Sequence, residues 1–124
     1  MNFFKTDNLF FDVDKLIIAI MADDNIEVVF QEAPEKKIKL PDKDTLKKEF
    51  EAISGECAKH GFAVSNKVVI KPEYLEYVYI YKERSLAIKL KSYERVMYAY
   101  YVNPEKVKIE FDKLYKNIKG KSGK

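Results

Sequence analysis

Two stretches of the sequence carry the same apolar pattern 61 positions apart, and this repetition is what most limits the fold. In each stretch the apolar side chains follow the i, i+4, i+7, i+11 spacing of one helix face, and four matches at one offset indicate an internal duplication. If both faces are buried, truncating Phe50 or Phe111 to Ala costs about 3 to 5 kcal/mol. The matched positions are Leu46, Phe50, Ile53 and Cys57 in the first stretch, and Val107, Phe111, Leu114 and Ile118 in the second.

Residues that favour helix ends flank both stretches. Asp42 or Asp44 can cap the start of the first helix, and the Asn-Pro pair at 103–104 is a favoured start for the second. Gly61 and Gly120 stand where a left-handed residue would end each helix. The sequence therefore predicts one helix in each half.

Alternating apolar residues before each helix predict four strands in each half. They span 8–13, 16–22, 25–31 and 36–40, then 66–71, 74–82, 85–91 and 95–102. We therefore expect an α+β protein made of two ββββα units. The first repeat covers 1–61, the second covers 62–120, and a flexible basic tail follows at 121–124. A unit of about 60 residues is marginal alone, so we expect the two units to share one core.

This element order resembles that of the PUR repeat, a ββββα unit that works as an intertwined pair, and that of the Whirly proteins. The resemblance covers the whole chain and is one of element order. It implies antiparallel sheets with one helix per unit, and it implies binding of single-stranded DNA or RNA, as in known PUR proteins. No site residue is carried over from it.

Charge and aromatic residues divide the chain into two unlike halves. The total charge of +3 is no argument for a nucleic-acid or membrane partner. Positions 1–61 hold 9 basic and 13 acidic residues, whereas positions 62–124 hold 14 basic and 7 acidic residues. All nine tyrosines follow position 73. A ligand that uses cations and aromatic rings would therefore meet the second half.

The stretch "YVYIYKE" at 77–83 places Tyr at every second position, which puts the rings on one face of a strand. Lysines alternate in the same way on the next strand, and an arginine lies at the turn and another on the fourth strand. Rings interleaved with cations suit single-stranded nucleic acid, because bases stack on rings and phosphates attract cations. The candidate nucleic-acid-binding residues are Tyr77, Tyr79, Tyr81, Arg84, Lys89, Lys91 and Arg95.

The same rings could instead pack against the other half or a second subunit and leave their hydroxyls in water. The first half does not repeat the pattern, since its counterparts are Ala19, Met21 and Asp23. Its acidic surface could attract a basic protein or the basic half of another copy. A protein-interaction module, such as an inhibitor, adaptor or subunit, is therefore the alternative function, and a homo-oligomer is compatible with it.

No catalytic or metal-binding motif emerges from the sequence. Cys57 and His60 could both touch a metal, but a structural zinc needs four ligands and no other Cys or His exists. Cys57 lies on the apolar stripe, which predicts a buried, inert thiol. The longest apolar run, 16–22, is about a third of a membrane span. We therefore expect a cytoplasmic, non-enzymatic binding module with no cofactor, no metal and no membrane contact.

Overall fold

The computed structural model describes residues 1–91 and 93–122, which form strands, two 3₁₀ turns and two long helices. In chain order they are β1 (Phe3–Lys5), β2 (Phe10–Asp12), η1 (Val13–Lys15), β3 (Leu16–Met21), β4 (Asn25–Phe30), β5 (Lys36–Lys39), α1 (Lys43–Lys59), β6 (Ala63–Val64), β7 (Val68–Ile70), η2 (Pro72–Tyr74), β8 (Leu75–Tyr81), β9 (Ser85–Leu90), β10 (Tyr93–Tyr100) and α2 (Pro104–Ser122).

The predicted α+β class, with antiparallel sheets and two helices, is confirmed. The order strand, 3₁₀ turn, three strands and helix occurs in 10–59 and again in 68–122, while the duplication itself stays a prediction. β1 and β6 were not predicted. The expected tail at 121–124 begins inside α2, because the helix runs to Ser122, and 123–124 lie outside the described residues.

The strands form a five-stranded sheet, a three-stranded sheet and the β1–β2 hairpin. In the five-stranded sheet the order is β5-β4-β3-β7-β6, so that strands from both halves of the chain lie side by side. β7 pairs antiparallel with β3 and places Ile70 opposite Ile18. The three-stranded sheet has the order β10-β9-β8 and uses the second half alone.

Two apolar clusters form the core, and β3 contributes to both. Ile18 and Ile20 join a cluster with residues of β7, β9, β10 and α2, so this cluster draws on both halves of the chain. Leu16 and Ala19 join a second cluster with the buried face of α1. Because both faces of β3 are buried, its sequence is a continuous apolar run rather than an alternation of apolar and polar residues.

The helix ends follow the sequence signals in part. Asp42 caps α1, because its side chain accepts a hydrogen bond from the Thr45 backbone N–H at 2.8 Å. The Asn103 side chain accepts one from the Lys106 N–H at 2.9 Å and caps α2 in the same way. Gly61 follows α1 with a φ of +87°, a conformation that favours glycine. The prediction for position 120 was wrong, because α2 continues through it.

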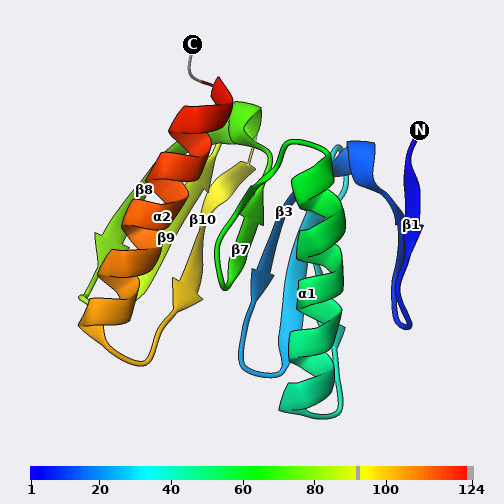
Figure 1. The fold of residues 1–124 in the computed structure, drawn as a ribbon, viewed down its shortest axis with the longest axis horizontal. Coiled ribbons are helices and arrows are strands. Elements are labelled where there is room, and N and C mark those ends of the chain that lie inside the picture. Colours follow the sequence, from blue (N-terminus) through cyan, green and yellow to red (C-terminus); the bar gives the residue numbers. More distant parts are fainter. Residues whose placement is uncertain (92, 123–124) are drawn as a thin grey trace.

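Figure 1 shows both helices on the same side of the sheets, with α2 across the three-stranded sheet and α1 across β3. The short strand β6 contacts both helices. Neither helix, over the residues described, is long and apolar enough to cross a membrane.

Candidate functional site

A row of tyrosines covers the outer face of the three-stranded sheet. Neighbouring rings lie 5.3 to 6.4 Å apart between their centroids, a separation at which aromatic rings pack against one another. The row runs along β8 and crosses to β10. We call this surface the tyrosine face, and its members are Tyr77, Tyr79, Tyr81, Tyr98 and Tyr100.

The register of the sheet explains why the rings meet. Ala87 of the central strand lies between Tyr79 and Tyr98, which are its two register partners. Ser85 lies in the same way between the next two tyrosines. Directly opposite residues share one face of a sheet, and these two side chains are too short to separate the rings above them. Both are consequently buried, at 0% and 4% relative exposure.

Several rings of the tyrosine face are open to solvent. Tyr77 and Tyr79 are 44% and 43% exposed, and Tyr100 is 60% exposed. Burial raises the pKa of Tyr98, and the neighbouring Tyr79 raises it further. Tyr98 is therefore a neutral phenol at physiological pH, so the face presents apolar rings with hydroxyls that can donate or accept hydrogen bonds.

The predicted cations differ in their surroundings. Lys89 is the register partner of Tyr77, but its Nζ donates to the Leu90 carbonyl at 2.8 Å and lies 3.3 Å from Glu76 Oε1. Arg84 lies at the β8–β9 turn, and Lys91 follows β9; both are exposed.

A cation outside the prediction also contacts the face. Lys82, at the β8–β9 turn, places its Nζ 5.2 Å from the centroid of the Tyr81 ring. A cation at this distance is attracted by the ring electrons, so the turn end of the tyrosine face carries positive charge.

Arg95 has a partner elsewhere. It forms an ion pair with Glu35, and Tyr93 Oη donates to the same Glu35 oxygen at 3.0 Å. The Glu35 side chain is only 10% exposed, so moving Arg95 to a ligand would leave a buried carboxylate without its cation. Arg95 therefore links β10 to the loop that precedes β5.

Two tyrosines of the face, Tyr98 and Tyr100, were missing from the sequence-based set. Their signal was the alternation in "YAY" at 98–100, which has the same period as 77–81. The next residue, Tyr101, points to the core and is 8% exposed.

An acidic hollow borders the β10 side of the tyrosine face. Its volume is about 250 Å³, and Tyr98 and Tyr100 line it together with carboxylates of the β3–β4 hairpin. Lys67 also lines it and donates from Nζ to the Tyr100 carbonyl at 2.6 Å. Lys37 pairs with Glu27 and Lys39 pairs with Asp24, each at 3.7 Å, so the negative charge of this border is partly balanced. The carboxylates are those of Asp23, Asp24 and Glu27.

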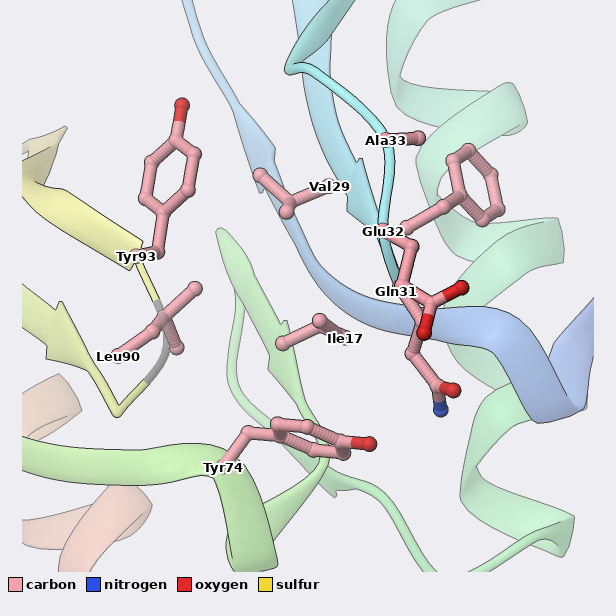
Figure 2. A pocket seen from close by; sticks show the side chains of 9 residues that line it. Ile17, Val29, Gln31, Glu32, Ala33, Tyr74, Leu90 and Tyr93 are labelled. Carbon is pink, nitrogen blue, oxygen red and sulfur yellow. The ribbon is translucent and has the colours of Figure 1, made fainter.

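A second cavity, of about 280 Å³, lies at the seam between the two large sheets. Figure 2 shows Ile17, Val29 and Leu90 on its apolar surface, with the rings of Tyr74 and Tyr93 beside them. The Tyr93 hydroxyl is already bonded to Glu35. The cavity offers apolar contact and no arrangement of nucleophile and base.

The Cys57 side chain is 0% exposed, and burial raises the pKa of its thiol to about 12. His60 Nε2 lies 3.2 Å from Glu56 Oε2 on the same helix. In the described part of the chain no group of three or more His, Cys, Asp or Glu side chains could hold a metal ion.

We expect the Cys57 thiol to resist modification in the native protein. A buried thiol with a raised pKa is almost entirely protonated at neutral pH, and the thiolate is the reactive form. Reaction with a disulfide reagent should be slow in buffer and fast in denaturant, followed by the absorbance of the released thiol. Rapid reaction in buffer would contradict the buried position.

Comparison with protein-family models gives no match, and no curated protein matches the sequence. Among solved structures, the chain is similar to the LytTr DNA-binding domain of a Bacillus cereus protein described as a methyl-accepting/DNA response regulator. The TM-score is 0.50 and the sequence identity is 15%. The match covers 91% of this chain and 94% of that chain. At this identity the likeness concerns the fold alone.

Proposed function

We propose that the chain is a non-enzymatic module that binds single-stranded DNA or RNA on the tyrosine face. The observation that carries the proposal is the unbroken row of five rings across β8 and β10, several of them open to solvent. Every base has a flat face that can stack on such rings, at about 1 to 3 kcal/mol per base. In a duplex those base faces are hidden, so an aromatic surface favours unpaired strands.

The charges near the β8–β9 turn support the same function. Lys82 and Arg84 at this turn, and Lys91 at the other end of β9, are exposed and could meet phosphates of a strand whose bases lie on the rings. The similar LytTr domain is a DNA-binding domain by its description, which is compatible with the proposal.

A protein partner is the second candidate, and the acidic hollow favours it. Tyr98 and Tyr100 lie beside three carboxylates there, and rings combined with carboxylates suit a Lys or Arg side chain of a basic protein or of a second copy. In that case the exposed tyrosines would be covered by protein rather than by bases.

Tyr79→Ala is expected to weaken binding of an oligothymidylate by about 1 to 3 kcal/mol, because one stacking ring is lost. Tyr79→Phe keeps the ring and should bind nearly as well as the native chain. Tyr115→Ala removes a 59% exposed tyrosine from α2 and is the matched control, with no loss expected. Fluorescence anisotropy at low salt measures all four proteins.

Two outcomes would contradict the nucleic-acid proposal. One is an absence of oligonucleotide affinity in the native chain at low salt, where phosphate contacts are strongest. The other is an equal effect of Tyr79→Ala and Tyr115→Ala. If Tyr79→Ala instead lowers the melting temperature or breaks an oligomer, the rings pack against protein.

A further inference from the structure

A groove of about 450 Å³ lies between the two helices. α1 forms one wall, α2 contributes to the other, and the turn at 65–67 between β6 and β7 lies at its base. In Figure 1, β7 and the turn before it lie between the helices. The proposed function makes no use of this groove.

The charge of the groove is predominantly positive. Lys47 of α1, Lys67 of the turn and Lys113 of α2 line it, against the single carboxylate of Glu51. Lys47 and Lys113 are exposed and form no ion pair within the described residues. Three lysines from three separate elements therefore line the groove against one carboxylate.

Lys67 is held in place by the fold. Its Nζ donates to the Tyr100 carbonyl at 2.6 Å and lies 5.3 Å from the centroid of the Tyr101 ring. Burial lowers the pKa of Lys67, and Lys43 and Lys106 lower it further against an opposing effect of Asp23. The largest charge effect on Lys67 is that of Asp23, which raises the pKa, so burial is the main cause of the lowered value.

The wall of the groove contains a buried hydroxyl, and the turn at its base is fixed by a hydrogen bond. Ser54 lines the groove, and its Oγ is buried without a hydrogen-bond partner. The turn below is fixed by Glu110, whose Oε1 accepts a hydrogen bond from the Asn66 backbone N–H at 2.7 Å. A ligand with several acceptor oxygens and negative charge would satisfy the lysines.

We propose that this groove binds a phosphate group. Its oxygens would accept hydrogen bonds from the ammonium groups of Lys47, Lys67 and Lys113. The phosphate could belong to a nucleic-acid backbone or be free, as inorganic phosphate. A nucleic-acid backbone as the source rests on the proposed function. A strand on the tyrosine face could extend into the groove, because Met21 and Lys67 line both the groove and the hollow beside Tyr100.

The test compares two double variants that remove the same charge. Lys47→Gln with Lys113→Gln removes groove lysines, whereas Lys48→Gln with Lys116→Gln removes exposed lysines of the same helices that lie outside the groove. Inorganic phosphate is titrated into each protein and the backbone amide signals of 65–67 are followed by NMR. Oligothymidylates of about 4 and about 16 nucleotides are bound in parallel.

We expect phosphate to shift the 65–67 signals in the native chain and in the outer-lysine variant, and not in the groove variant. If the strand also enters the groove, the groove variant should bind the long oligonucleotide about ten-fold more weakly than the outer-lysine variant, and the short one equally well. If phosphate shifts the signals while both oligonucleotides bind the two variants alike, the source is free phosphate.

The proposal and the proposed function fail in different ways. Absence of phosphate-induced shifts in the native chain, together with equal oligonucleotide binding by the two variants, would overturn the groove proposal and leave the tyrosine face intact. Absence of all oligonucleotide binding with retained phosphate shifts would overturn the proposed function and support a groove for free phosphate.

Discussion

Phe50→Ala is expected to lower the free energy of unfolding by about 3 to 5 kcal/mol, measured by urea denaturation. The Phe50 side chain is 2% exposed and belongs to the cluster between α1 and the five-stranded sheet. Removing the ring leaves a cavity that the surrounding strands cannot close, which adds to the lost hydrophobic transfer. Phe10→Ala, at a 67% exposed position, is the control and should change stability by less than about 0.5 kcal/mol.

The matched position on the other helix should respond less. Phe111 corresponds to Phe50 in the sequence pattern, but it is only partly buried and lines a shallow groove with Val78 and Ile118. We therefore expect Phe111→Ala to cost about 1 to 2 kcal/mol rather than the amount that the pattern alone predicts. Equal losses at both positions would show that α2 is packed as tightly as α1.

Local patterns predicted most of the elements. The period of the apolar residues located β3, β4, β8 and β9 to within about two residues, because strands with a buried face must alternate or be wholly apolar. Cap residues located the start of both helices for the same local reason. β6 has only two residues, which is too short to produce a period.

The pairing of strands could not be predicted in this way. β7 joins β3 of the first half, and nothing near 68–70 in the sequence identifies that neighbour. The same limit applies to Arg95, whose partner Glu35 lies 60 positions away. Both contacts depend on how the sheets pack, which local propensity does not encode.

The sequence predicted three of the five rings of the tyrosine face. The alternation at 77–81 identified the β8 rings, since a strand of this composition has one polar-aromatic face. On β10 the register shifts between Tyr93 and Met97, so the face of each later residue cannot be counted from the start of the strand. Sequence alone therefore leaves open which rings of "YAYY" at 98–101 meet solvent.

A chain divided after Gly61 is expected to lose cooperative unfolding in both fragments, the largest effect that the structure predicts. The first fragment would keep β3 without β7, and one face of β3 would lose the cluster to which Ile18 and Ile20 belong. The second fragment would keep β7 with the two-residue strand β6 but without β3, its other partner. Fragments of about 60 residues are marginal even with an intact core.

Circular dichroism during heating measures this prediction, because a cooperative fold gives a sigmoidal transition and a disordered chain does not. Mixing the two fragments is the control. If the pairing of β3 with β7 is what each fragment lacks, the mixture should recover helical signal and a sigmoidal transition. A cooperative transition in either fragment alone would mean that the cluster shared by the two halves is dispensable, and that this half carries enough buried apolar surface to fold without the other.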